Sequence, residues 1–246
     1  MTAPVFVVEH FDAGRGGRYV LDGPEGRHAV SVKRLRAGED VVLTDGSGRW
    51  ADCVVLDTEG KDRLILQLDS VSEEPAEQPR VTVVQALPKG DRGELAVETM
   101  TETGVDAIVP WAAARCITQW KGERGAKALG KWRATAREAG KQSRRVRFPE
   151  VAEAATTKQV AALLAGADFG AVLHESGDAP LATAELPATG EIVLVVGPEG
   201  GVAPEELALF EEAGAQAYRL GRSVLRTSTA GTAAAAVLLA RTGRWS

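Results

Sequence analysis

The stretch that decides the fold is IVLVVGPEGG, residues 192–201, in which five apolar residues lead directly into a loop with three glycines. An unbroken apolar run of this length is typical of a strand that is buried on both faces. A helix is expected to follow from Pro204 to Ala213, with Gly214 just past its end. The loop would then lie at the carboxyl end of a buried strand, where α/β sheets usually bind ligands. An ordinary strand-to-helix turn fits the same spacing.

A second unusual stretch is LGRSVLRTSTAG, residues 220–231, which places cations and hydroxyl groups beside glycines. A simple connection would need few of these side chains, so the stretch is a second candidate ligand loop. The hydroxyls of Thr227, Ser228 or Thr229 would equally serve as a cap for the last helix. Neither stretch contains the GxGxxG pattern or the GK[ST] of a P-loop, which disfavours a nucleotide-phosphate cradle.

Strand and helix candidates alternate along the chain after residue 80. This alternation predicts a parallel α/β sheet with helices on both faces. The last helix, around residues 229–241, is apolar all round, so it is expected to be buried, with a subunit interface as one possible place. The strands are expected at residues 81–86, 105–109, 169–173, 192–196 and 217–220, and the helices at 91–103, 127–142 and 204–213.

The N-terminal part of the chain has a different pattern. From Val5 to about Val71, short apolar or alternating runs are separated by turn residues such as Asp45-Gly46-Ser47-Gly48. Residues 70–79 contain two prolines and three glutamates, which indicates a solvated connection. We therefore expect a small all-β domain over residues 1–72 and an α/β domain over residues 73–246.

Composition excludes several classes of protein. The chain has 246 residues, 44% of them hydrophobic, so it can bury a substantial core in one large or two modest domains. Cys53 and Cys116 provide neither a disulfide framework nor a four-cysteine zinc site, so no metal is expected. No stretch approaches the roughly 20 apolar residues that cross a bilayer, and the N-terminus has no basic region of a signal peptide. We expect a cytoplasmic protein without a membrane partner.

Positive charge is concentrated in one segment, although the whole chain has a net charge of −5. From Arg115 to Arg147 there are eleven cations and two glutamates, Glu123 and Glu138, which gives a local net charge of +9. Such a patch would bind the phosphate backbone of RNA without reading its bases, and Lys33, Arg34 and Arg36 could extend it. Trp120 and Trp132 lie in the same segment and could stack on a base. A solvated helix face is the alternative.

These motifs, together with residues spread over nearly the whole chain, resemble the RsmE family of knotted SPOUT methyltransferases. The chain departs from the family pattern at Ser228, where the family often has glutamate. Besides the two glycine-containing stretches, the matching residues are His28, Val32, Lys33, Arg34, Gly38, Asp45, Gly46, Lys89, Thr101, Glu102, Gly104, Val105, Pro110, Arg115, Cys116, Trp132, Ala139, Gln142, Ser143, Arg145 and Pro149.

The resemblance implies an N-terminal PUA-like β-barrel, a C-terminal α/β domain tied in a trefoil knot, and a homodimer. It also implies methyl transfer from S-adenosylmethionine to N3 of one uridine in 16S ribosomal RNA, either free or in the small (30S) subunit. The residues implied to bind the cofactor are Leu173, His174, Gly197, Glu199, Gly200, Gly201, Leu220, Gly221, Val224, Leu225 and Arg226.

Methylation of uracil N3 requires that the N3 proton leaves. The enzyme therefore needs a base, or a cation that stabilises the uracil anion through its carbonyl oxygens. Glu102 is the candidate base, and Arg145 and Arg226 are the candidate cations. A surface carboxylate or ion-pair partner is the alternative for Glu102, and phosphate positioning is the alternative for the arginines. The residues expected to contact RNA are Lys33, Arg34, Arg36, Lys89, Lys141, Arg144 and Arg145.

Three other functions are alternatives to this one. Ribose 2′-O methylation is compatible with the two cofactor loops, because these loops do not identify the acceptor atom. A non-catalytic RNA-binding factor of ribosome assembly would use the basic segment and leave the glycine loops structural. A dinucleotide oxidoreductase is disfavoured, since the chain lacks its glycine fingerprint and the acidic residue roughly 20 positions later.

Overall fold

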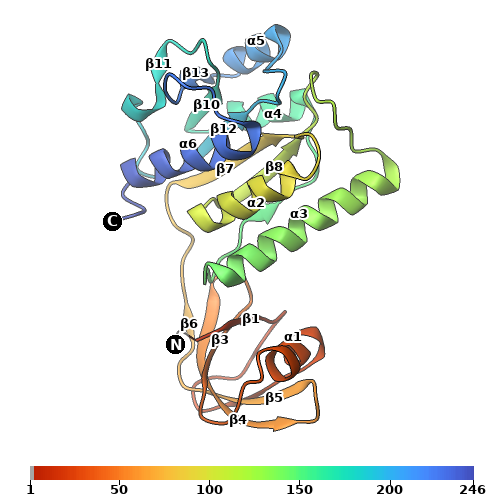
Figure 1. Cartoon of the computed structure of the whole chain (residues 1–246). Coiled ribbons are helices and arrows are strands. Elements are labelled where there is room, and N and C mark those ends of the chain that lie inside the picture. Colours follow the sequence, from red (N-terminus) through yellow and green to blue (C-terminus); the bar gives the residue numbers. More distant parts are fainter. Residues whose placement is uncertain (1–2) are drawn as a thin grey trace. The chain divides into compact units, whose positions relative to one another are not determined.

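The computed structural model describes residues 3–246, which divide into two compact units (Figure 1). The first unit contains the described residues up to Ala76 together with Gly140–Phe148. The second contains Glu77–Ala139 and Pro149–Ser246. Within the described residues, no helix is both long and apolar enough to span a membrane.

The first unit is built on a mixed six-stranded sheet with the order β1-β3-β4-β5-β2, in which β6 also pairs with β4. β1 and β3 are parallel and the other pairs are antiparallel. Side chains alternate along β5, so that Leu64, Leu66 and Leu68 enter the core between more exposed neighbours. The strands are β1 (Val5–Val7), β2 (Arg18–Leu21), β3 (Asp40–Thr44), β4 (Arg49–Glu59), β5 (Arg63–Leu68) and β6 (Ser72–Glu73).

The first unit also contains helical turns, so the prediction of an all-β domain is wrong in this detail. A short helix, α1 (Gly23–Arg27), continues into one π-helical turn, η1 (His28–Val32). Pro24 at the start of α1 has the φ angle that a first helical turn needs. Ala29 is fully buried and anchors these turns on the sheet.

Residues 140–148 group with the first unit, which differs from the expected division at residue 72. The Phe148 amide donates to the Gly46 carbonyl at 2.8 Å, and the Thr44 hydroxyl donates to the Val146 carbonyl at 3.0 Å. The Arg147 guanidinium donates to the Glu74 carbonyl. These contacts join residues 73 to 102 positions apart, which sequence patterns along the chain do not report.

The second unit is built on seven parallel strands in the order β11-β13-β10-β12-β7-β8-β9. β12 lies inside the sheet, where Ile192 is in register with Val81 of β7 and with Phe169 of β10. The strands are β7 (Arg80–Ala86), β8 (Ala107–Trp111), β9 (Glu150–Val151), β10 (Phe169–Leu173), β11 (Ala179–Pro180), β12 (Glu191–Val196) and β13 (Gln216–Arg219).

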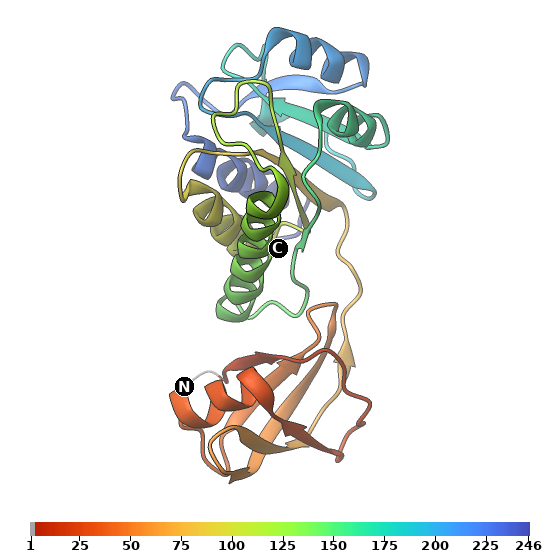
Figure 2. The ribbon, with the colours of Figure 1, turned by 90° about the vertical axis from the view of Figure 1, so that its right-hand side faces the viewer.

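Helices cover both faces of this sheet, which confirms the predicted parallel α/β architecture (Figure 2). Ile192 and Leu194 of β12 point to the face that carries α2, α3 and α6, whereas Val193 and Val195 point to the face that carries α4 and α5. The helices are α2 (Arg92–Thr103), α3 (Gly122–Gln142), α4 (Thr157–Ala165), α5 (Pro204–Glu212) and α6 (Thr227–Arg241), with a 3-10 turn η2 (Leu181–Thr183).

Two helices differ from the sequence expectation. α4 was not predicted, although Thr156 and Gln159 form a capping box that marks its start. α6 begins at Thr227 and buries Ala234, Leu238 and Leu239 completely or almost so, but other apolar residues of this helix remain partly exposed in the chain. The expected burial all round α6 is therefore only partly realised.

Candidate functional site

The second unit has a cavity of about 550 Å³ at the carboxyl ends of β10, β12 and β13. Because these strands are parallel, the loops that follow them meet at one edge of the sheet. The three loops that supply most of the cavity wall are residues 173–175, 196–202 and 218–227. Three residues from other parts of the unit, Arg92, Arg115 and Ala230, complete it.

Every residue that the sequence comparison with the family singled out for the cofactor lines this one cavity. Leu173 and His174 follow β10, Gly197 to Gly201 follow β12, and Leu220 to Arg226 follow β13. Stretches separated by 19 to 23 positions in the chain are thus brought together by the strand order. The residues concerned are Leu173, His174, Gly197, Glu199, Gly200, Gly201, Leu220, Gly221, Val224, Leu225 and Arg226.

The first loop, residues 197–202, is fixed by hydrogen bonds from neighbouring segments. The backbone amide of Lys89 donates to Glu199 Oε1 at 3.1 Å, and Arg115 Nη1 donates to the Gly200 carbonyl at 3.0 Å. Within the loop, the Gly201 amide donates to the Pro198 carbonyl at 2.8 Å, and Gly201 has a positive φ of 74° that favours glycine. This wall of the cavity is therefore preformed.

A buried carboxylate, Glu206, supports the same wall from inside the protein. Its side chain is in the first turn of α5, where the helix dipole favours negative charge, and the residue is 5% exposed. Oε1 accepts hydrogen bonds from the Ala114 amide at 2.8 Å and the Thr157 hydroxyl at 2.9 Å, and Oε2 accepts from the Ala203 amide at 3.2 Å. Glu206 thus ties the segment before Arg115 to the end of the first loop.

The second loop, residues 220–226, is far more open. Val224 is 78% exposed and Leu225 is 40% exposed, although both are apolar. In the part of the chain that the structure describes, residues 222–225 form no hydrogen bond or ion pair. Arg226 is the N-cap residue of α6 without a side-chain capping bond, and the Thr229 hydroxyl donates back to the Arg226 carbonyl at 3.2 Å. Helix capping by these hydroxyls is therefore wrong as an explanation of the motif.

Gln85 connects β7 to the start of α6 and was missed by the sequence analysis. The residue is fully buried, and its Nε2 donates to the Ala86 carbonyl at 3.1 Å and the Thr227 carbonyl at 3.3 Å. Its Oε1 has no hydrogen-bond partner among residues 3–246. The sequence signal for this role was a glutamine inside an apolar strand, because a buried polar side chain is usually held by hydrogen bonds to a specific partner. Here the amide anchors the residue that follows the second loop.

The charge in the cavity favours an anionic group. Five arginines line it against two glutamates, Glu175 and Glu199. Arg219 is engaged by the Gly177 and Asp178 carbonyls. The cations available to a ligand are therefore those of Arg92, Arg222 and Arg226, none of which forms an ion pair among the described residues. The carboxylate of an amino acid or a phosphate of RNA would be attracted here.

Two other polar rings line the cavity. Burial raises the pKa of Tyr218, so its phenol stays protonated at neutral pH and donates to Gln216 Oε1 at 2.7 Å. His174 Nδ1 accepts a hydrogen bond from the Ser176 amide at 3.2 Å, which requires that this nitrogen is unprotonated. Tyr218 is therefore a structural group, and His174 lines the cavity with its Nδ1 engaged by the backbone.

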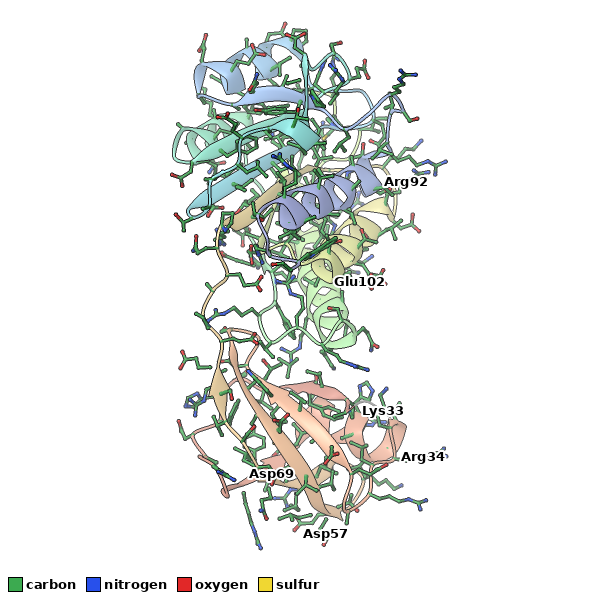
Figure 3. The ribbon with its side chains drawn as sticks, turned by 90° about the vertical axis from the view of Figure 1, so that its left-hand side faces the viewer. Lys33, Arg34, Asp57, Asp69, Arg92 and Glu102 are labelled. Carbon is green, nitrogen blue, oxygen red and sulfur yellow. The ribbon has the colours of Figure 1, made fainter. Side chains whose placement is uncertain are left out.

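The three predicted catalytic residues occupy different places. Arg226 lines the cavity. Glu102 is exposed near the end of α2, ten residues or about 15 Å along the helix from Arg92, which lines the cavity (Figure 3). Arg145 belongs to the first unit, where its backbone amide donates to the Gly140 carbonyl. Within one chain, the structure thus places Arg226 at the cavity and Glu102 away from it.

The predicted RNA contacts are mostly accessible. Lys33, Arg34 and Arg36 are exposed on the turn after η1, where Figure 3 shows Lys33 and Arg34 at the surface of the first unit. Arg144 is also exposed, and Lys89 is exposed beside the first loop. These residues keep their predicted role as candidates.

The prediction that Lys141 contacts RNA is wrong. Lys141 is 7% exposed, and its ammonium group donates to both oxygens of Glu25 at 2.9 and 3.1 Å. A buried and paired cation is not available to a phosphate, so Lys141 holds the residue 140–148 segment on α1 instead. The basic segment is therefore not one uniform patch, because Arg133 is also paired, with Glu153 at 2.9 Å.

The cysteines are structural. Burial, with the nearby Asp52 and Asp69, raises the pKa of Cys53 to about 12, and burial also raises the pKa of Cys116. Both thiols therefore stay protonated at neutral pH and are poor nucleophiles. The described residues contain no group of three or more histidine, cysteine, aspartate or glutamate side chains that could hold a metal ion.

Comparison with known families matches both parts of the chain. Residues 75–239 match the model of an RNA methyltransferase domain, and residues 21–69 match the model of an RNA methyltransferase PUA domain. The chain is 45% identical over 249 aligned residues to the ribosomal RNA small subunit methyltransferase E of Mycobacterium bovis, covering 100% of this chain and 94% of the relative. The protein of the same name from Bacillus subtilis is 29% identical, with 86% of each chain covered.

Solved structures give the same result. A ribosomal RNA small subunit methyltransferase E from Neisseria gonorrhoeae, bound to S-adenosylmethionine, superposes with a TM-score of 0.85 at 28% identity and covers 98% of each chain. A methyltransferase from Legionella pneumophila in complex with the same cofactor has a TM-score of 0.83 at 27% identity, again over 98% of each chain. The similarity therefore includes both units and the cavity.

Proposed function

The chain belongs to the family of ribosomal RNA small subunit methyltransferase E, and from this premise we propose that it transfers a methyl group from S-adenosylmethionine to N3 of one uridine in 16S ribosomal RNA. The observation that carries the proposal is the cavity at the ends of β10, β12 and β13, which all the expected cofactor residues line. Its volume of about 550 Å³ suits a ligand of this size. Relatives with this fold hold S-adenosylmethionine in their structures.

The residues of the cavity fit the parts of this cofactor. Gly201 leaves room for a ligand beside the backbone, because a Cβ there would meet only Arg115 Nη1 at 3.8 Å, and Leu173 and Leu220 supply apolar surface for an adenosyl group. Arginine side chains are available for the carboxylate of its methionine part. When bound, S-adenosylmethionine supplies a methyl group that its sulfonium already makes electrophilic. The protein must then position the acceptor and manage its proton.

We assign to Arg226 the stabilisation of negative charge on the uracil base that accepts the methyl group. Arg226 combines a permanent positive charge with a position at the cavity, so it can stabilise negative charge on a uracil carbonyl oxygen as the N3 proton leaves. Glu102 would act as the base only if a second chain brought it to this cavity. The substitution Glu102→Gln tests whether Glu102 is the base. It removes the carboxylate that would take the N3 proton and keeps the side-chain shape, so methylation should be lost only if Glu102 is the base.

RNA binding is assigned to cations of both units. Lys33, Arg34, Arg36 and Arg144 are exposed on the first unit, and Lys89 is exposed beside the first loop of the second. Such side chains would bind phosphates and orient the RNA, while the cavity selects the reacting base. Arg145 stays a candidate for the same function.

We further propose the finer features of the family architecture: a barrel in the first unit, a trefoil knot in the second, and a homodimer. The path from β13 to α6 supports the knot, because β13 pairs with β10 and β11 whereas α6 packs on β7, β12 and α2. Exposed apolar side chains such as Val224, Ile117 and Leu95 support a partner surface. Sedimentation of the purified chain would test the dimer.

Two measurements test the proposed function. Mass-spectrometric mapping of 16S ribosomal RNA from cells without this protein should show one uridine that lacks its base methyl group. A missing ribose methyl would instead support 2′-O methylation. Calorimetry should show binding of S-adenosylmethionine to the purified chain. Normal RNA modification together with no cofactor binding would leave a non-catalytic RNA-binding role and refute the proposal.

A further inference from the structure

The second unit contains a second groove, of about 320 Å³, that no expected cofactor residue lines. It lies between the first turn of α2, the segment at Thr118 and Trp120, and the first half of α3. We call it the tryptophan groove and define it by Gly93, Glu94, Trp120, Arg124, Lys127 and Lys131. The function described above makes no use of it.

Three cations form one wall of the tryptophan groove. Arg124, Lys127 and Lys131 are spaced by three and four residues on α3, which places them on one face of the helix. All three are exposed, and in the described part of the chain none of their side chains forms an ion pair or hydrogen bond. Glu94 is the carboxylate that lines the groove, so these four side chains carry a net charge of +2. This wall is suited to a phosphate-containing ligand.

An aromatic surface forms another part of the groove. Trp120 is half-buried and packs against the edge of Trp132, with ring centroids 5.0 Å apart and an interplanar angle of 79°. Trp132 is only 3% exposed, so it cannot stack on a base itself, and it acts instead as the support that fixes the Trp120 ring. A fixed and partly exposed indole beside free cations is the combination that single-stranded nucleic acids recognise.

The buried indole also leaves a polar atom at the groove. The Nε1 edge of Trp132 lies against Gly93, where an added Cβ would come within 2.7 Å of the ring. Nε1 is not one of the described polar atoms that are fully buried without a partner, and Trp132 lines the groove. An acceptor on a ligand in the groove could take a hydrogen bond from this indole nitrogen, which is a donor only. The close approach of helix and ring explains why residue 93 is glycine.

We propose that the tryptophan groove binds one nucleotide of the RNA substrate, next to the nucleotide that is methylated. The base would stack on Trp120, its phosphates would contact Arg124, Lys127 and Lys131, and Glu94 would accept a hydrogen bond from the base edge. An acidic peptide would use the cations but not the aromatic surface. The inference rests on the proposed RNA methyltransferase function and names a part of its substrate-binding surface.

The position of the groove relative to the cavity supports a shared RNA strand. Arg92 lines the cavity, whereas the next two residues of α2, Gly93 and Glu94, line the groove. Less than one helical turn of α2 therefore separates residues that line the two sites. The amide of Lys89, just before this turn, is held by Glu199 of the first loop. A strand that crosses the start of α2 would contact both.

The phosphate contacts of this wall are tested by measuring how the affinity of the full-length chain for a fluorescein-labelled oligouridylate depends on salt concentration. Removing one phosphate contact in Lys127→Ala should reduce the slope of log K against log salt concentration by about 0.7. The matched control is Lys158→Ala, which removes an exposed lysine from α4 on the opposite face of the sheet. Equal slopes in the two variants would overturn the phosphate assignment.

The stacking surface is tested at constant salt. Trp120→Leu should weaken oligouridylate binding about tenfold, and Trp120→Phe, which keeps a ring, should retain most of the affinity. Trp245→Leu is the control, since Trp245 is an exposed tryptophan near the end of the chain and away from the groove. If the leucine and phenylalanine variants at residue 120 bind equally well, the stacking role is refuted.

Cofactor binding separates this inference from the proposed function. Calorimetry with S-adenosylmethionine should give the same affinity for Lys127→Ala, Trp120→Phe and the unmodified chain. If the unmodified chain methylates small-subunit RNA but the groove variants match their controls, the groove assignment fails and the function stands. If the unmodified chain neither binds the cofactor nor methylates RNA, the proposed function itself fails.

Discussion

The two loops of the cavity differ in how the protein holds them. The first loop, residues 197–202, is fixed by Lys89, Arg115 and its own turn, and the buried Glu206 stabilises the segments around it. The second loop, residues 220–226, exposes apolar side chains, and its residues 222–225 form no hydrogen bond within the described chain. One half of the site is therefore preformed, and the other half is left for a ligand or a second chain to order.

This difference has a physical consequence for binding. Ordering a loop costs conformational entropy when the ligand arrives, whereas a preformed wall has met that cost during folding. Substitutions in the first loop and its supports should therefore lower the free energy of unfolding. Substitutions in the second loop should leave that free energy unchanged and affect ligand binding or assembly instead.

The largest effect is expected from Glu206→Leu. This change leaves the Ala114 and Ala203 amides without their buried acceptor, so we expect a loss of about 3 kcal/mol in the free energy of unfolding. Glu206→Gln keeps one oxygen acceptor and should lose less. Urea denaturation followed by tryptophan fluorescence measures both. The control is Glu205→Leu on the exposed side of the same turn, and a similar loss there would contradict the assigned support.

A smaller loss is expected from Gly197→Val in the first loop. A Cβ at this position would lie 2.9 Å from Val202 Cγ2 and 3.3 Å from the Val202 amide nitrogen, and Val202 is buried. Such crowding typically costs about 1–3 kcal/mol. Gly221→Val is the matched change in the second loop, where an added Cβ meets no atom within 4 Å. Equal melting temperatures for the two variants would remove the distinction between the loops.

A local effect is expected from Arg115→Ala. This change removes the hydrogen bond to the Gly200 carbonyl without creating a cavity, because Arg115 is exposed. Hydrogen exchange of the Gly201 amide should become about tenfold faster, since the turn opens more often, while global stability changes little. Arg222→Ala in the second loop should leave this exchange rate unchanged. Faster exchange in both variants would show that the stability of the first loop depends on the positive charge around the cavity and not on the hydrogen bond from Arg115.

The positions of strands and helices along the chain were predicted better than the contacts between distant segments. Two local signals identified β12 and α5 nearly to the residue: the apolar run at residues 192–196, and the proline and glycine that mark the start and end of the helix at Pro204. The short α1 and α4 were missed because five to nine residues leave little periodicity to detect. Residues 140–148 were placed in the wrong unit, since their partners are about 100 positions away.

For the candidate site, too, local motifs were predicted from the sequence and long-range contacts were not. The cofactor residues were predicted from the family motifs, and the parallel strands bring them to one cavity. Glu206 and Arg92 were missed because their roles depend on burial and on register, which a sequence does not display, whereas Gln85 had a signal as a glutamine inside an apolar strand. Lys141 was predicted to contact RNA from its charge alone, and its burial against Glu25 shows why a count of cations overstates a binding surface.

The smallest effect on unfolding is expected from Val224→Ser in the second loop. Val224 is 78% exposed, so the polar side chain removes almost no buried apolar surface and the free energy of unfolding should change by less than about 0.5 kcal/mol. The matched change in the first loop, Val202→Ser, should cost about 2 kcal/mol or more, because Val202 is 4% exposed. Denaturation at several protein concentrations sharpens the comparison. A loss at Val224 that grows as the protein is concentrated would mean that a second chain covers this loop in solution, whereas a loss at every concentration would show that the loop is held within its own chain.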